Sequence, residues 1–189
     1  MTAALAYDAF ITPEDYLERE QSSTMKHEYL DGQIVAMTGA GRKHNVLTLG
    51  LGSKLLPKAR KLSCQLFVSD MKLRLDHQGE VYFYYPDLVL TCAADDRHDL
   101  YCTTPCLLVE VLSPSTWRVD YFEKRQAYTL IQSLREYVIV HQEKQCVEVF
   151  RRTPSGWQHE ALSQGEVYFA CLDARVTVEE IYADIVWDF

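Results

Sequence analysis

Residues 85–92 read YPDLVLTC, and residues 106–128 read CLLVEVLSPSTWRVDYFEKRQAY. The apolar runs 88–92 and 106–112 are short and rich in leucine and valine, which is typical of buried strands. Each run carries a carboxylate that a buried strand disfavours, Asp87 at the start of the first and Glu110 inside the second. An ionised carboxylate there costs several kcal/mol unless a cation, a proton or strong donors compensate it. A divalent metal ion is the simplest compensation for both.

The residues after the second strand predict a helix with a polar face. Ser113-Pro114 ends the strand, and the helix is expected to begin near Arg118. Asp120, Lys124 and Tyr128 are spaced four apart, so they lie along one face of that helix. This face presents a carboxylate, an ammonium group and a phenol to the strands.

These motifs resemble the Uma2 family of restriction-endonuclease-like proteins, also called DUF820, within the PD-(D/E)xK nuclease superfamily. The resemblance rests on YPD at 85–87, VEVLSPST at 109–116 and the D-x3-K-x3-Y pattern at 120–128. It extends to KHEYLDG at 26–32, His44-Asn45 within 41–49, and VSDM at 68–71, and covers roughly residues 10–150. It implies an α/β fold with a restriction-endonuclease-like core. The expected architecture is a mixed central β-sheet flanked by helices, in a single domain over residues 1–189.

The resemblance implies an endonuclease that hydrolyses DNA phosphodiester bonds with Mg²⁺ or Mn²⁺. Asp87 and Glu110 would bind the metal, together with the backbone carbonyl of Val111, and Glu28 matches the family's N-terminal acid that could also reach it. Hard oxygen ligands of this kind suit both cations. The metal site is therefore expected where the two strands lie side by side.

The expected catalytic lysine comes from the helix and not from the second strand. Most of the superfamily has a lysine two residues after the glutamate, where this chain has Leu112. Lys124 occupies the place that the Uma2 pattern supplies instead, where an ammonium group would orient water and offset developing negative charge. The supporting candidates are Glu28, His44, Asp70, Asp120 and Tyr128.

The charge distribution indicates one segment that could contact nucleic acid. The chain has a net charge of −8, which argues against non-specific coating of DNA or RNA. Residues 33–69 nevertheless contain no acidic residue, and their basic side chains either form a phosphate-facing surface or a solvated helix face. The candidate contacts are Arg42, Lys43, Lys54 and Lys58. The expected partner is DNA, single- or double-stranded, and a homodimer would supply two sites for two strands.

Other functions are weaker matches to the sequence. A catalytically inert nucleic-acid-binding or scaffolding protein would keep the fold, with Lys124 pairing to Glu110 or Asp87 in place of a metal. Paired carboxylates could serve a glycosidase, but Lys124 and the basic segment would then have no task. One departure from the family is His141-Gln142 where Asp-Pro is common; we expect it to affect turn geometry, away from the metal.

The remaining residues predict the other elements. Helices are expected at about 12–20, 43–62 and 178–185, and strands at 27–30, 33–37, 66–75, 81–84, 136–141 and 146–151. Several of the six cysteines alternate with apolar residues in predicted strands, as reduced, buried thiols do. A zinc site at His98, Cys102 and Cys106 lacks a fourth ligand. Residues 1–10 hold no signal-peptide pattern and no apolar run is long enough to span a bilayer, so no membrane association and a cytoplasmic location are expected.

Overall fold

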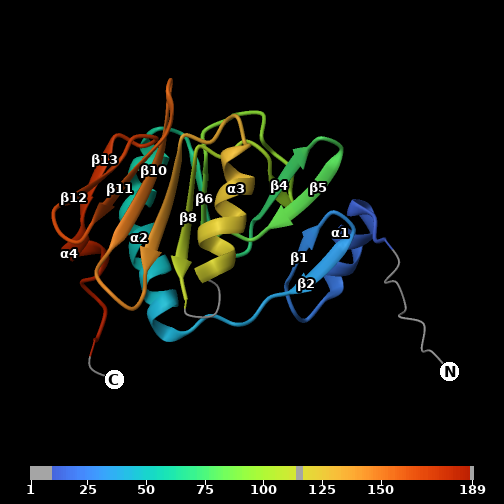
Figure 1. Ribbon diagram of the computed structural model, residues 1–189, viewed down its shortest axis with the longest axis horizontal. Helices are drawn as coiled ribbons and strands as arrows, with labels where there is room; N and C mark the ends of the chain where they lie inside the picture. The colour runs from blue at the N-terminus through green and yellow to red at the C-terminus, as the bar shows by residue number, and fades with distance from the viewer. Residues whose placement is uncertain (1–9, 114–116, 188–189) are drawn as a thin grey trace.

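The computed structural model describes residues 10–113 and 117–187, except for the side chains of residues 119 and 120. A six-stranded mixed sheet forms its central layer (Figure 1). Only β8 and β9 are parallel in this sheet; the other neighbours are antiparallel. In sheet order its strands are β11 (Gly156–Leu162), β10 (Val147–Thr153), β9 (Glu136–His141), β8 (Leu107–Leu112), β6 (Leu88–Thr91) and β3 (Gln65–Val68).

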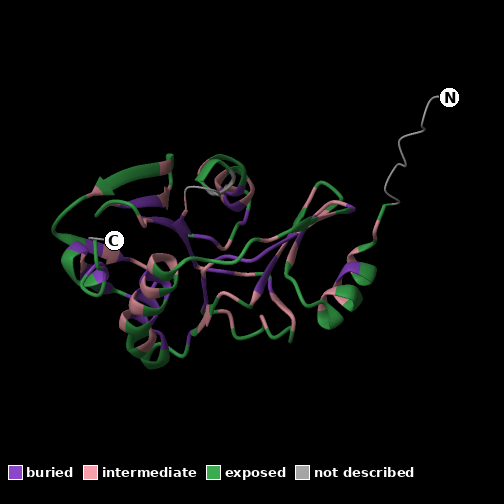
Figure 2. Ribbon diagram, turned by 90° about the horizontal axis from the view of Figure 1, so that it is seen from below, coloured by how far each residue is buried: buried purple, intermediate pink, exposed green. Residues whose placement is uncertain are grey.

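Helices cover both faces of the central sheet, as predicted. The helix α2 (Arg42–Lys61) packs its leucines on one face. On the other face lie the π-helix η1 (Val119–Lys124) and α3 (Arg125–Thr129). Figure 2 shows that buried residues concentrate in the strands between these helices. The site is thus built inside a two-sided core.

A second sheet extends the molecule on the N-terminal side. Its order is β2-β1-β5-β4-β7, and α1 (Pro13–Ser22) packs on β1. A cluster of Tyr16, Tyr29 and Phe83 holds this helix to the sheet. The strands are β1 (His27–Leu30), β2 (Gln33–Ala36), β4 (Lys72–His77), β5 (Glu80–Tyr84) and β7 (Tyr101–Cys102). The hairpin β12 (Glu166–Phe169) and β13 (Ala174–Thr177) precedes α4 (Val178–Ile181).

The predicted strand 66–75 is wrong, because the chain changes sheets in its middle. β3 belongs to the six-stranded sheet and β4 to the five-stranded sheet, with a break at Ser69, whose φ is 58°. The return crossing, from β5 to β6, passes through Asp87, whose carbonyl accepts the Ser69 N–H at 3.0 Å. Alternating apolar residues do not reveal such a crossing, since the pattern continues through both strands. Asp87 therefore lies at the junction of the two sheets.

Local signals placed most other elements well. Asp31 and Gly32 have φ values of 42° and 94°, as a type I′ hairpin requires, and they join β1 to β2. Thr12 and Thr177 cap their helices as expected, but α4 ends at Ile181, earlier than predicted. The short strand β7 is not among the predicted strands. No helix in the described ranges is long and apolar enough to cross a membrane, and most of residues 1–10 lies outside them.

The prediction of reduced cysteines is wrong for four of the six. Cys64 pairs with Cys92 and Cys106 with Cys171, so Cys106 is unavailable for zinc. Cys64 and Cys92 flank the paired strands β3 and β6, which places them together. The Cys102 thiol instead contacts Asp96 at 2.8 Å. The cytoplasmic location stays a prediction.

Candidate active site

Strand geometry aims Glu110 at the helix that carries Lys124. All of β8 is buried, and alternate residues face opposite sides of the sheet. Val109 and Val111 join the cluster beneath α2, whereas Leu108 and Leu112 join the cluster beneath η1 and α3. Glu110 shares the face of these leucines and therefore points toward η1 and α3.

Lys124 joins two buried carboxylates. Its Nζ lies 2.9 Å from Glu28 Oε1 and 3.3 Å from Glu110 Oε1, and all three residues are buried. The phenol of Tyr128 donates a hydrogen bond to the same Glu110 oxygen at 2.9 Å. Burial raises the pKa of Tyr128 well above its ordinary value, with a further contribution from Glu110, so the phenol remains a donor. Lys124 and Tyr128 thus compensate the buried charge of Glu110.

Asp87 reaches the same region from the neighbouring strand. β6 and β8 are antiparallel with Leu88 opposite Val109, which places Asp87 beside Glu110 at the end of the ladder. Asp87 Oδ2 accepts the Val111 N–H at 2.7 Å, and His44 Nε2 lies 3.1 Å from the same oxygen. The two predicted metal ligands therefore lie side by side, Glu110 within β8 and Asp87 just before β6.

A pocket of about 720 Å³ opens onto these groups, and we call it the carboxylate pocket. Asp87, Glu110 and Lys124 line it together with His44 and Gly41, at the start of α2. Gly41 is the N-cap of this helix and has no side chain to bind the first N–H groups. Because the N-terminus of a helix carries partial positive charge, the pocket combines acidic groups with the positive end of α2.

The donor set matches the chemistry of Mg²⁺ or Mn²⁺. No three His, Cys, Asp or Glu side chains gather as metal ligands within residues 10–113 and 117–187. Mg²⁺, however, is commonly held by one or two carboxylates and keeps several waters. Asp87 and Glu110 supply two carboxylates on one pocket wall. The residues present fit such an ion in type and number.

Asp70, Lys54 and Lys58 are not among the residues that line this pocket. Asp70 is exposed and pairs with Lys26, and the side chain of Asp120 lies outside the described part. Lys54 and Lys58 are 10 and 14 residues along α2 from His44, a rise of roughly 15 and 21 Å. Only Arg42 and Lys43 stand in the first turn of α2, next to the pocket.

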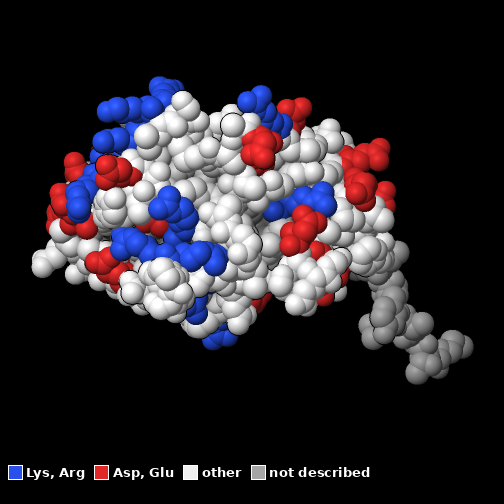
Figure 3. Space-filling view, turned by 90° about the horizontal axis from the view of Figure 1, so that it is seen from above, with Lys and Arg blue, Asp and Glu red and all other residues white. Residues whose placement is uncertain are grey.

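The basic side chains therefore do not form one continuous surface around the carboxylate pocket. α2 begins at the lower end of the molecule in Figure 1 and runs upward. Figure 3 views the opposite end, where lysine and arginine side chains gather in patches with acidic groups between them. The segment 33–69 divides into a part beside the pocket, at Arg42 and Lys43, and a part remote from it.

Sequence reasoning missed part of the pocket. Gln142 and Ser113 line it, although the His141-Gln142 departure was expected to lie away from the metal. That expectation is wrong because β8 and β9 are parallel, with Leu112 paired to His141, so both strands end at the same edge. The signal that could have revealed this is the parallel pairing of these two strands, because the carboxyl ends of parallel strands lie at the same edge of a sheet.

Comparison with known proteins agrees with this architecture. The Uma2 family, described as "Putative restriction endonuclease", matches residues 13–179. Uncharacterized protein slr1290 of Synechocystis sp. is 33% identical over 147 residues, covering 77% of this chain and 76% of that protein. Uncharacterized protein sll1609 of the same organism is 36% identical over 142 residues, covering 73% and 78%.

A solved structure has a similar fold. The crystal structure of "a putative nuclease belonging to DUF820" from Anabaena variabilis superposes with a TM-score of 0.73 and 14% identity, covering 92% of this chain and 98% of that one. At this identity the likeness concerns the fold alone. The family match spans most of the chain and includes Asp87, Glu110 and Lys124. This chain belongs to the Uma2 family.

Proposed function

We propose that this protein is a Mg²⁺- or Mn²⁺-dependent endonuclease that hydrolyses DNA phosphodiester bonds, on a restriction-endonuclease-like core. The observation that carries the proposal is the convergence of Asp87, Glu110 and Lys124 on one pocket. Two adjacent carboxylates beside a buried ammonium group match the requirements of phosphodiester hydrolysis. Family membership supports the same reaction class.

Asp87 and Glu110 would hold the cation in this proposal. The chemistry that a divalent cation supplies in such a site is polarisation of a phosphate oxygen and acidification of a bound water. The Val111 N–H and His44 fix the orientation of Asp87, while Tyr128 fixes Glu110. Well-oriented carboxylates reduce the cost of assembling the site for the reaction.

Lys124 and the start of α2 would act on the phosphate. The Lys124 ammonium group lies within the pocket lining, where it can orient a water molecule and stabilise the negative charge of the transition state. Gly41, the N-cap of α2, lines the same pocket, and the partial positive charge of a helix N-terminus favours a phosphate oxygen. Lys124 and the N-terminus of α2 would both interact with the phosphate in the conformation described above.

One observation favours an inert binding or scaffolding protein as the second candidate. Lys124 already lies within ion-pair distance of both Glu28 and Glu110. A buried carboxylate paired in this way needs no metal to be stable. The two candidates differ in divalent cation binding: the nuclease requires it at Asp87 and Glu110, whereas the inert protein does not.

The test is cleavage of supercoiled and single-stranded DNA by the purified protein with Mg²⁺, Mn²⁺ or EDTA. Asp87→Asn and Lys124→Ala are compared with Asp95→Asn, a matched control at an exposed aspartate in the loop before β7. Calorimetric titration with Mn²⁺ is done on the same proteins. We expect cleavage that EDTA and both pocket substitutions abolish, with the control unchanged.

Two results would overturn the nuclease proposal. Cleavage that persists in Asp87→Asn and Lys124→Ala preparations would come from a contaminant or another site. A folded wild-type protein with neither cleavage nor Mn²⁺ binding would support the inert candidate.

A further inference from the structure

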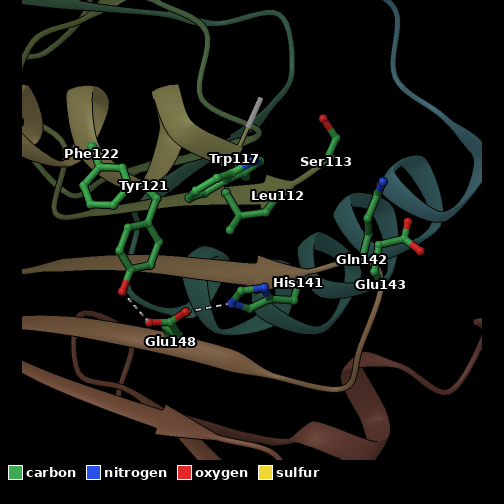
Figure 4. A pocket seen from close by; sticks show the side chains of 9 residues that line it. All are labelled: Leu112, Ser113, Trp117, Tyr121, Phe122, His141, Gln142, Glu143 and Glu148. Atoms are coloured by element: carbon green, nitrogen blue, oxygen red, sulfur yellow. Dashed lines mark hydrogen bonds and ion pairs between the residues drawn. The ribbon is translucent and has the colours of Figure 1, made fainter. Parts of the chain in front are cut away.

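A second pocket, which we call the aromatic pocket, adjoins the carboxylate pocket. Its volume is about 510 Å³, within the roughly 300–1,000 Å³ of small-molecule sites. Ser113 and Gln142 line both pockets, so the two are neighbours at these residues. The other lining residues, shown in Figure 4, are Leu112, Trp117, Tyr121, Phe122, His141, Glu143 and Glu148.

Three aromatic rings from one short segment form a wall of this pocket. Trp117 and Phe122 are 43% and 49% exposed, although both are large apolar side chains. Phe122 meets Trp117 and Tyr121 edge to face, with ring centres 6.1 and 5.1 Å apart. Exposed aromatic side chains gathered in a pocket mark a binding surface more often than a solvated face.

A buried carboxylate network holds the remaining wall in place. Glu148 is 8% exposed and accepts hydrogen bonds from the Tyr121 hydroxyl at 3.2 Å and from His141 and His159 at 2.7 and 2.6 Å. Figure 4 shows Tyr121 and His141 converging on this carboxylate. The side chain of Arg125 also covers the Tyr121 ring. Tyr121 is thereby fixed, so the aromatic wall is preformed.

The charge of the lining selects against a phosphate. Glu143 and Glu148 are its ionisable acids, and no Lys or Arg occurs among the described lining residues. Cations stand at the rim instead, where Arg118 lies over the Trp117 ring and Lys43 lies 3.5 Å from Glu143. An uncharged planar group fits the interior, and an attached phosphate fits the rim or the carboxylate pocket. A nucleotide within a strand has both parts.

We infer that the aromatic pocket binds an unstacked nucleobase of single-stranded DNA, next to the phosphate held in the carboxylate pocket. This inference rests on the proposed function and specifies the form of its substrate. Stacking on Trp117 or Phe122 would hold the base, since every base has a face for such contacts. Gln142 and Ser113 would meet its polar edge. Paired bases are stacked inside a duplex and cannot enter without being extruded.

The winding of one helix places the two pockets side by side. Tyr121 and Phe122 face the aromatic pocket, while Lys124 faces the carboxylate pocket, and all three lie in η1. The wider turn of a π-helix is often found at functional sites. A single strand lying across η1 would contact both pockets at neighbouring nucleotides.

The test measures binding of a fluorescently labelled single-stranded oligodeoxynucleotide, the matched duplex, and the same strand with one abasic site, all with EDTA to prevent cleavage. Trp117→Ala and Phe122→Ala are compared with Trp117→Phe, which keeps an aromatic ring. Leu130→Ala is the matched control at an apolar side chain of similar exposure, 42%, outside the pocket lining. Thermal unfolding and light scattering accompany each variant, because Trp117 is exposed and its removal should not disturb folding.

We expect Trp117→Ala to weaken single-strand binding roughly 5- to 150-fold, with Trp117→Phe and Leu130→Ala near the wild type. Duplex binding should change little. Equal single-strand affinity in wild type and Trp117→Ala, or no single-strand binding at all, would overturn the inference. A wild-type dimer that dissociates in Trp117→Ala without a change in DNA affinity would also overturn the inference, since a second copy of the chain would then cover the rings. Base-dependent binding by a protein that never cleaves would refute the proposed function and leave this inference standing.

Discussion

Replacing Lys124 with methionine tests whether its ammonium group compensates the buried carboxylates. Methionine keeps an unbranched side chain of similar length but leaves Glu28 and Glu110 without the cation now 2.9 and 3.3 Å away. Removing one partner of a buried ion pair costs about 3–5 kcal/mol. Lys124 is 5% exposed, so water cannot easily replace it. We therefore expect the free energy of unfolding at neutral pH to fall by about that amount.

The loss should depend on pH in a defined direction. Without the cation, two buried carboxylates repel each other, so the pKa of at least one rises in the folded variant. A raised carboxyl pKa destabilises the fold above that pKa, and the penalty is relieved as the pH falls and the group binds a proton. The difference in unfolding free energy between wild type and Lys124→Met should thus shrink from neutral to mildly acidic pH.

Urea unfolding of four proteins measures both effects: wild type, Lys124→Met, Glu28→Gln and the double variant. Because the glutamine removes one of the opposing charges, the double variant should be more stable than Lys124→Met by about 0.5–3 kcal/mol. A loss under about 1 kcal/mol at neutral pH, with no pH dependence, would refute the view that Lys124 neutralises these carboxylates.

Three further predictions follow from other contacts. Tyr128→Phe removes the hydrogen bond to Glu110, so unfolding free energy should fall by about 1–3 kcal/mol in urea titrations. Burial raises the pKa of Glu148, but hydrogen bonds from His141 and His159 outweigh it and lower the pKa below 4.5. This stabilisation exists above the ordinary pKa and disappears as pH falls through the lowered one, so Glu148→Gln should flatten the acid loss of stability. Reducing both disulfides, whose cysteines are 28 and 65 residues apart, should cost about 3–4 kcal/mol each in the same assay.

Local chemistry in the sequence was sufficient to place the central elements. The buried run around Glu110 and the spacing of Lys124 and Tyr128 are short-range patterns, and the structure brings the three side chains into contact. The same holds for the hairpin at Asp31-Gly32, where the turn residues determine the backbone conformation. Patterns of this kind can be recognised in the sequence because they depend on residues that are close together in it.

Long-range pairing could not be deduced in the same way. The disulfide between Cys106 and Cys171 depends on where a distant hairpin packs, which no local spacing encodes. Gln142 reaches the carboxylate pocket only because β9 lies parallel to β8, and the aromatic pocket needs Glu148 from β10 as well. The sequence contains these residues, but only the order of the strands in the sheet brings them together.

The position of Lys124 connects the resting site to the proposed reaction. A lysine two residues after Glu110 would lie on the same strand and the same face as that carboxylate. Lys124 instead belongs to a π-helix that also carries Tyr121 and Phe122. A strand of DNA that stacks a base on these rings would contact the same turn of helix that positions the ammonium group. Binding of a DNA strand would thereby be coupled, through this one helix, to whether Lys124 pairs with Glu28, Glu110 or a phosphate. Base-dependent binding that changes with Lys124→Met would support this coupling, whereas metal-dependent cleavage is what distinguishes the nuclease from an inert nucleic-acid-binding protein.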